Sequence, residues 1–269
     1  MARGKIHYEA NHLSSALPDF TKAIEIETNT PSETPQMIKY VEHYRERGKT
    51  YFLLDRFDEA AADFERAIAL SSGASEWHDY QWRALAHVSL GRCAQAWDDM
   101  SQAIAMAPKT GDNYFFRALI ALEMGQYREA LADLEKSAAY DTTATGRSYG
   151  NFWRAIIHTL LVQTAEADQC LALSLEAGKE ISERNLQLRA LSLNALFQGE
   201  SSLVYHYAEQ FVAQETKLYR FSRHREYVTL LGKLFPQRED IRQFSLWFED
   251  QWKALLTEAP GENIDGPVA

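Results

Sequence analysis

The 269-residue chain has few of the residues that cross-link a fold through disulfides or anchor it in a membrane. Its two cysteines, Cys93 and Cys170, are too few for a disulfide framework and are typical of a reducing compartment. No run of about 18 apolar residues occurs, so the sequence predicts no membrane span. The residues after Met1 form no apolar signal segment. We therefore expect a cytoplasmic protein.

Positive charge is also scarce. The chain has 28 lysines and arginines against 38 acidic residues, which gives a net charge of −10. Such a surface repels the phosphate backbone, so the composition disfavours a nucleic-acid partner. Apolar residues make up 46% and charged residues 25%, the mix of an ordinary globular protein rather than a disordered one.

The chain contains an internal repeat. A small residue stands near the start of each copy, and an alanine follows twelve positions later in the first five copies. The small residues are Gly4, Gly48, Ala84, Ala118, Ala155 and Ala190. Their spacing, between 34 and 44 residues, is typical of proteins built from stacked helical repeats.

Each copy predicts two antiparallel helices. Apolar and small residues recur at intervals of three, four and seven, which is the period of one helix face. Gly91 and Gly125 separate the two halves of their copies, where glycine can end a helix in the left-handed conformation. Small residues at fixed places allow two helices to cross closely. Neighbouring pairs must then stack, because one pair alone cannot bury its apolar face.

These copies resemble tetratricopeptide repeats. The second copy carries consensus residues of both helices, namely Tyr44, Arg47, Gly48, Tyr51, Phe57, Ala60, Phe64 and Ala67. The resemblance covers roughly residues 1–215. It implies an all-α, right-handed superhelical solenoid whose concave surface binds other proteins.

The repeat pattern divides the chain into three parts. Residues 1–215 are predicted to form about five helix pairs, with a proline-containing loop insertion near 27–37. The repeat stops after this, but helical spacing continues through 216–258, so we predict helices that cap the last repeat. Residues 259–269 contain two prolines and two glycines and are predicted to be a flexible tail.

A charged column accompanies the repeat. An arginine precedes the small residue of every copy, and an aspartate follows the first four arginines by sixteen residues. The arginines are Arg3, Arg47, Arg83, Arg117, Arg154 and Arg189, and the aspartates are Asp19, Asp63, Asp99 and Asp133. The constant interval predicts a ladder of Arg–Asp pairs that ties the two helices of each copy together. In the fifth copy, Cys170 takes the place of the aspartate.

No motif predicts catalysis. The sequence lacks a glycine-rich phosphate loop, a Gly-x-Ser-x-Gly elbow and a His-Glu-x-x-His pair. Neither cysteine has a nearby histidine partner. His87 and His158 occupy the repeat position of Tyr51, which favours a packing role over metal binding. We therefore predict no catalytic residue, no metal site and no cofactor.

One basic cluster stands out near the C-terminus, formed by Lys217, Arg220, Arg223, His224 and Arg225. We interpret it as a solvated helix face, with a site for an acidic partner as the alternative.

The resemblance to tetratricopeptide proteins implies that the first helix of each pair lines the concave groove, and helical spacing then selects the face that points away from the small column. Its residues are Lys5, Arg45, Lys49, Phe52, Gln81, Leu85, Phe115, Leu119, Leu122, Phe152 and Ile156. The cations stand at the N-terminal end and the apolar residues follow. We therefore expect a protein or peptide partner that is acidic at one end and apolar in the middle.

The leading functional hypothesis is a non-enzymatic adaptor that binds a peptide or helix of a partner in this groove. An alternative is a homo-oligomeric scaffold that associates through the apolar groove or the aromatic C-terminal helix. A third hypothesis is a regulatory subunit of an enzyme complex. The helix that carries Phe244, Trp247 and Phe248 either caps the solenoid or occupies the groove itself.

Overall fold

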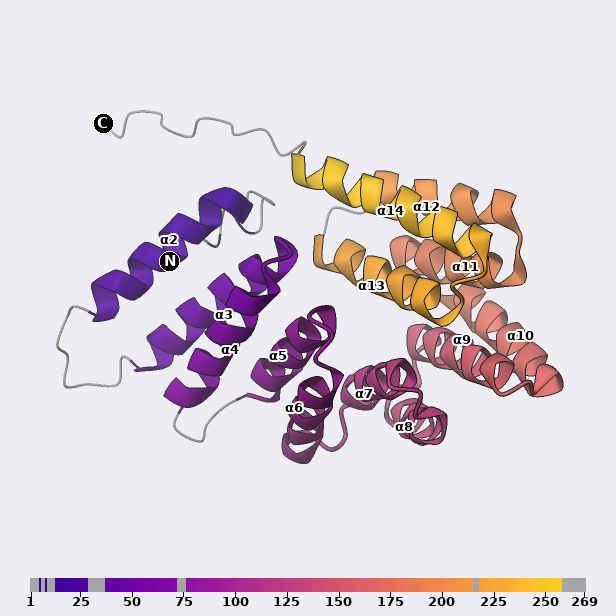
Figure 1. The fold of residues 1–269 in the computed structure, drawn as a ribbon, viewed down its shortest axis with the longest axis horizontal. Helices are drawn as coiled ribbons and strands as arrows, with labels where there is room; N and C mark the ends of the chain where they lie inside the picture. The colour runs from indigo at the N-terminus through magenta and orange to yellow at the C-terminus, as the bar shows by residue number, and fades with distance from the viewer. Residues whose placement is uncertain are drawn as a thin grey trace.

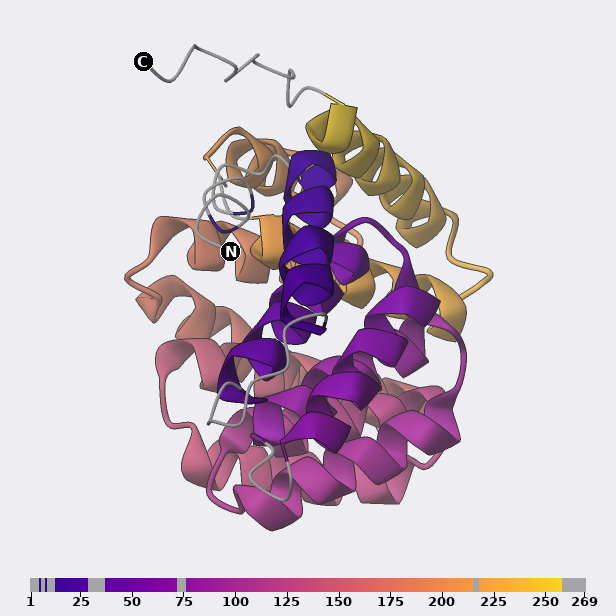
Figure 2. The ribbon, with the colours of Figure 1, turned by 90° about the vertical axis from the view of Figure 1, so that its left-hand side faces the viewer.

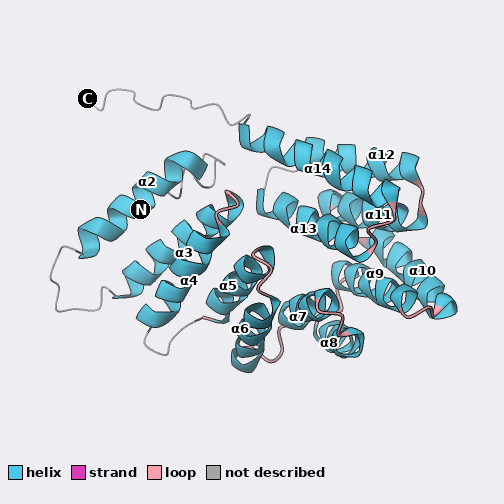
Figure 3. Cartoon of the chain, in the orientation of Figure 1, coloured by secondary structure: helices cyan, strands magenta, loops and turns pink. Residues whose placement is uncertain are grey.

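The computed structural model describes residues 5, 8, 13–28, 37–71, 76–214 and 218–257, and within these ranges every regular element is a helix (Figure 3). The thirteen described helices are α2 (Leu13–Thr28), α3 (Met37–Leu53), α4 (Phe57–Leu70), α5 (Trp77–Ser89), α6 (Cys93–Met106), α7 (Gly111–Glu123), α8 (Tyr127–Tyr140), α9 (Ala144–Leu160), α10 (Thr164–Glu180), α11 (Arg184–Gln198), α12 (Ser201–Gln214), α13 (Leu218–Leu234) and α14 (Glu239–Thr257). The predicted all-α repeat fold is confirmed. The centre of the predicted loop near 27–37 and the predicted tail at 259–269 lie outside the described residues.

Consecutive helices pair from α3 with α4 through to α13 with α14. The pairs follow an arc, with the first helix of each pair on its inner side and the second on its outer side (Figure 1). Figure 2 shows the arc from the side of α2. The chain curls far enough for α13 to lie inside the arc and contact α3, so the last helix pair comes back to the first repeats.

Close helix crossing explains the column of small residues. A Cβ atom on Gly48 of α3 would lie 3.0 Å from Cε2 of Phe64 on α4, which is tighter than ordinary packing. Ala84, Ala118 and Ala155 occupy the equivalent positions and are almost completely buried. A larger side chain at these positions would push the two helices of the pair apart.

One residue in the left-handed conformation lies in each of the turns α3–α4, α5–α6, α7–α8, α9–α10 and α11–α12. The residues are Asp55, Gly91, Gly125, Val162 and Gly199, with φ between 58° and 79°. In each turn, the next N–H donates to the carbonyl five residues earlier, at 2.8–2.9 Å. This is the Schellman pattern that ends helices, and glycine adopts it at low cost. The repeat therefore keeps the turn even where Asp55 and Val162 must take a conformation unfavourable for their side chains.

The predicted Arg–Asp ladder is present in three consecutive copies. Arg117 Nε and Nη2 donate to both carboxylate oxygens of Asp133 at 2.7 and 2.8 Å. The equivalent pairs Arg47–Asp63 and Arg83–Asp99 have the same two-bond geometry. Two parallel bonds per pair fix both the position and the orientation of one helix against the other.

The ladder also joins neighbouring repeats. Arg117 Nη1 donates to Ser101 Oγ on α6 at 3.2 Å, and the Arg47 guanidinium reaches Thr21 on α2 in the same way. In the fifth copy, the buried Nε of Arg154 has no hydrogen-bond partner among the described residues, because Cys170 replaces the aspartate. The side chains of Arg3 and Arg189 lie outside the described set.

The last two helices form an aromatic cluster with α12. His224 of α13 is completely buried, with ring centroids of Phe211 and Phe248 at 5.4 and 4.9 Å. Trp247 of α14 packs edge-on against Tyr205 of α12 at 5.5 Å. The aromatic face of α14 therefore packs against α12 and α13. The interpretation of the basic cluster as a solvated face is wrong for His224, since apolar packing encloses its ring.

Candidate partner-binding site

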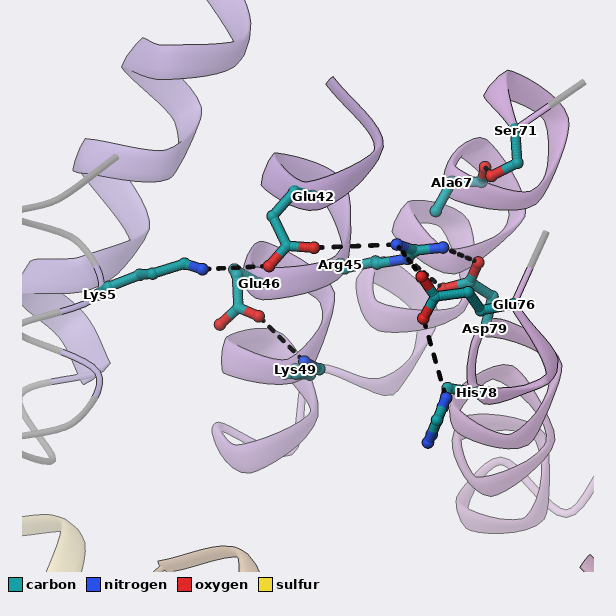
Figure 4. Close-up of polar contacts among 10 residues, drawn as sticks. All are labelled: Lys5, Glu42, Arg45, Glu46, Lys49, Ala67, Ser71, Glu76, His78 and Asp79. Atoms are coloured by element: carbon teal, nitrogen blue, oxygen red, sulfur yellow. Dashed lines mark hydrogen bonds and ion pairs between the residues drawn. The ribbon is translucent and has the colours of Figure 1, made fainter. Parts of the chain in front are cut away.

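Arg45, one of the three predicted groove cations, links α3 to α5 (Figure 4). Its Nε and Nη2 donate to the two carboxylate oxygens of Asp79 at 2.6 and 2.7 Å, and Nη1 donates to Glu76 at 3.3 Å. The hydrogen bond to Asp79, whose side chain is 2% exposed, is the main reason that the pKa of Arg45 is raised. The Arg45 guanidinium thus serves as a bridge between repeats.

The other two predicted cations are also paired with carboxylates (Figure 4). Lys5 Nζ donates to Glu42 at 3.1 Å, and Lys49 Nζ donates to Glu46 at 2.9 Å. Burial pushes the pKa of Glu42 up, but Lys5, Lys49 and Arg45 outweigh this effect and the pKa is lowered. The positive charge that the sequence places at this end is balanced by acids of the same chain.

The predicted apolar residues belong to helices on the inner side of the arc, and most of them are buried. Those with exposed fractions of 8% or less are Phe52, Leu85, Phe115, Leu122, Phe152 and Ile156. Gln81 is also buried and donates to Asn113 at 3.2 Å, which joins α5 to α7. Leu119 is only partly buried. Spacing along each helix therefore does not tell which side chains a partner can reach.

Helix α13 covers this inner face. The ring of Tyr227 lies 6.1 Å from that of Phe115 on α7 and 5.6 and 5.7 Å from those of Tyr149 and Trp153 on α9. Such contacts between rings stabilise the position of α13 beyond the area that they bury. The helix that occupies the groove is thus α13, while Phe244 of α14 is directed toward α12.

Two long-range ion pairs hold α13 in place. Arg225 donates to Asp55 in the α3–α4 turn at 2.7 Å and to Glu249 of α14 at 2.5 Å. Burial lowers the pKa of Arg225, but the two carboxylates outweigh it and the pKa is raised. Lys233, two turns further along α13, pairs with Glu123 at the end of α7. Arg225 is therefore not solvated either, and it closes the arc between residues 170 positions apart in sequence.

A cavity of about 320 Å³ remains between α13 and the inner helices. Its apolar wall is formed by Phe57, Leu85, Val88, Phe116, Leu119, Ile120, Tyr227 and Leu230. Charged residues at its edge are Asp55, Glu123, Arg225, Glu226, Lys233 and Glu249. Leu85 and Leu119 are the two predicted groove residues that line it. This arrangement suits a ligand whose apolar group enters the cavity while its polar groups remain beside the charged residues.

Sequence reasoning missed the residues that α13 contributes. The apolar residues Tyr227 and Leu230 stand at helical spacing, which indicates that one face of α13 is covered. That pattern does not say which surface covers it, since the ring contacts of Tyr227 join residues 74 to 112 positions apart. Only the three-dimensional path of the chain brings α13 to α5 and α7.

The described residues offer little chemistry of other kinds. Burial is the main cause that raises the pKa of both the Cys93 and the Cys170 thiols, which disfavours the reactive thiolate. No group of three metal-ligating side chains occurs in the part of the chain that the structure describes. Within the same ranges, no helix combines the length and apolar character that a membrane crossing requires.

The fold and its inner surface define a class, the helical-repeat solenoids. The profile of the tetratricopeptide repeat matches residues 1–75 and 83–147, more than half of the chain. The chain belongs to the tetratricopeptide repeat family, and the resemblance read from its residues is confirmed.

Individual relatives are distant. The Rap conjugation gene regulator of the plasmid pLS20, in complex with the Phr* peptide, superposes with a TM-score of 0.63 and 14% identity over 97% of this chain and 75% of that one. YrrB, described as having an unusual peptide-binding site, matches with a TM-score of 0.52 and 17% identity over 70% and 87%. These likenesses show the fold.

A curated relative matches part of the repeat region. The DnaJ homolog subfamily C member 7 homolog of Dictyostelium discoideum is 24% identical over 143 residues, which is 52% of this chain. The match spans about a quarter (26%) of that relative's length.

Proposed function

We propose that this protein is a non-enzymatic adaptor that binds a segment of a partner protein on the inner side of the arc. The segment inserts an apolar side chain into the cavity between α5, α7 and α13. Helix α13 forms one wall of this site, so partner and helix share the groove.

The apolar cavity is the observation that carries the proposal. Its volume, about 320 Å³, lies at the lower end of the range of about 300–1,000 Å³ that is common for ligand pockets. Leu119 and Val88 are partly exposed in its wall, and Tyr227 adds an aromatic ring to the same lining. An apolar opening with a charged edge favours one anchoring side chain over a broad flat contact.

Membership of the tetratricopeptide repeat family also supports a protein-binding function. Tetratricopeptide repeats form scaffolds, and two of the similar structures are described by a bound peptide or a peptide-binding site. The raised pKa of both described thiols gives no support to a catalytic role. These points favour binding of a protein segment without catalysis.

A peptide-display selection against the purified chain tests the proposal. Selected peptides are labelled, and their Kd is measured by fluorescence anisotropy with the wild type, Val88→Trp and Leu119→Trp. Both substitutions fill the cavity, so we expect binding to weaken by about tenfold or more. Leu173→Trp is the matched control, because Leu173 is exposed on the outer helix α10. Circular dichroism checks that all variants keep their helical content.

Equal affinity in the wild type and both cavity variants would overturn this site. Self-association is a distinct outcome that light scattering detects. A dimer that Leu119→Trp dissociates would assign the cavity to a second copy of the chain instead of a foreign segment.

A further inference from the structure

Two ion pairs cross the edge of the cavity from α13 to the opposite wall. Arg225 donates to Asp55 in the α3–α4 turn at 2.7 Å, and Lys233 pairs with Glu123 at the end of α7. All four side chains line the cavity. Arg225 and Lys233 are separated by two turns of the helix, which correspond to about 12 Å along its axis. The pairs therefore bridge the cavity at two separate places.

The two sides of α13 are packed differently. Toward α12 and α14, His224 is completely buried, and the rings of Phe211 and Phe248 lie 5.4 and 4.9 Å from its own. Toward α5 and α7, a cavity of about 320 Å³ remains beside the ring contact of Tyr227 with Phe115. Protein interiors rarely leave voids much larger than a water molecule. The ion pairs thus span a space that apolar side chains of the chain do not fill.

Both pairs are accessible to water. The side chain of Lys233 is half exposed, and Asp55, Glu123 and Arg225 each keep part of their side chains at the surface. Ion pairs of this kind are weak, so each of them opens and closes at room temperature. Glu249 of α14 also accepts a hydrogen bond from Arg225, so the guanidinium keeps a partner when Asp55 is released.

We propose that the pairs Arg225–Asp55 and Lys233–Glu123 form a latch that regulates entry into the cavity. The closed latch holds side chains of α13 across the entrance. When it opens, an apolar side chain of the partner enters while Tyr227 keeps α13 in place. This inference rests on the proposed function and adds its regulation. Because the partner binds only molecules with an open latch, its apparent Kd is the intrinsic Kd divided by the open fraction.

Charge reversals at the second pair test the latch. Lys233→Glu and Glu123→Lys each replace an attraction by a repulsion, so both should bind the peptide from the display selection about threefold to tenfold more tightly in fluorescence anisotropy. The two variants change the charge of the cavity edge in opposite directions, so a direct effect on charges of the peptide would have opposite signs. The double variant rebuilds the pair with reversed polarity and should return the Kd to the wild-type value.

The first pair gives an independent test. Asp55→Asn removes the charge that Arg225 meets, and asparagine tolerates the left-handed conformation of this turn. We expect about threefold tighter binding, a gain that misfolding cannot produce. Asp58→Asn is the matched control, because Asp58 forms an exposed ion pair with Arg92 at 2.8 Å and neither residue lines the cavity. Its affinity should equal that of the wild type.

The outcomes separate the latch from the site. If peptide binding depends on Leu119 but the two reversals leave the affinity unchanged, lower it in both, or shift it in opposite directions, the latch is overturned and the site remains. A double variant that binds no more weakly than the single reversals also overturns the latch, since the gain then does not come from the broken pair. If no selected peptide depends on Leu119, both proposals are overturned.

Discussion

The Arg–Asp ladder yields a quantitative prediction about stability. Asp133 is 4% exposed at its side chain and Arg117 is 17% exposed, so the pair is largely removed from water. Arg117→Ala leaves the carboxylate without its two donors and removes the bond to Ser101. An uncompensated buried charge of this kind costs about 3–5 kcal/mol. Arg117→Ala should lower the free energy of unfolding by that amount.

The double variant sharpens the argument. Replacing both Arg117 and Asp133 by Ala also removes the carboxylate that the single variant leaves unpaired. The double variant should therefore lose less free energy of unfolding than Arg117→Ala alone. Arg56→Ala serves as the control, because the Arg56–Glu59 pair is 46% exposed on both sides and contributes under about 1 kcal/mol.

Urea unfolding followed by circular dichroism measures all of these variants. The slope is compared as well as the midpoint, since stacked repeats can unfold in segments. If Arg117→Ala costs no more than Arg56→Ala, or if the double variant costs the sum of the singles, the reasoning about the ladder is refuted.

Three further predictions concern single positions. Val162 is 84% exposed in the left-handed conformation, so Val162→Gly should stabilise the fold by about 1 kcal/mol, and an unchanged or lower Tm would reject this. Cys170→Asp should give the buried Nε of Arg154 an acceptor and raise the free energy of unfolding in urea by about 1–3 kcal/mol. A loss of stability would show that an Arg–Asp pair cannot form between positions 154 and 170. Burial lowers the pKa of His87 despite nearby Asp99, so the unfolded chain binds the proton more readily and stability should fall as pH drops below about 6.5. His87→Gln should reduce that fall in Tm, and an identical pH profile would exclude His87 as its source.

The repeat features of the fold could be predicted because they depend on local spacing. The sixteen-residue interval between Arg117 and Asp133 spans the second half of one helix, the turn and the first half of the next helix. The structure keeps this geometry in three copies. The small residue Gly48 likewise stands where two helices cross most closely. Constraints that repeat in every copy leave a periodic trace in the sequence.

The binding surface could be predicted only in part. Helical spacing identified Leu85 and Leu119 on the inner face, and both line the cavity. The same rule selected Phe115, which Tyr227 covers, because spacing does not show what packs on a face. Arg45 was predicted to be a groove cation, and its pairing with the buried Asp79 of the next repeat was not foreseen. Contacts made once, between distant segments, leave no periodic trace.

A crystal structure of the chain bound to its tightest peptide from the display selection tests the central claim most directly. The account predicts an apolar peptide side chain within about 4.5 Å of Leu119 and Tyr227. A peptide bound on the outer helices, or elsewhere with the cavity between α5, α7 and α13 unfilled, would contradict it.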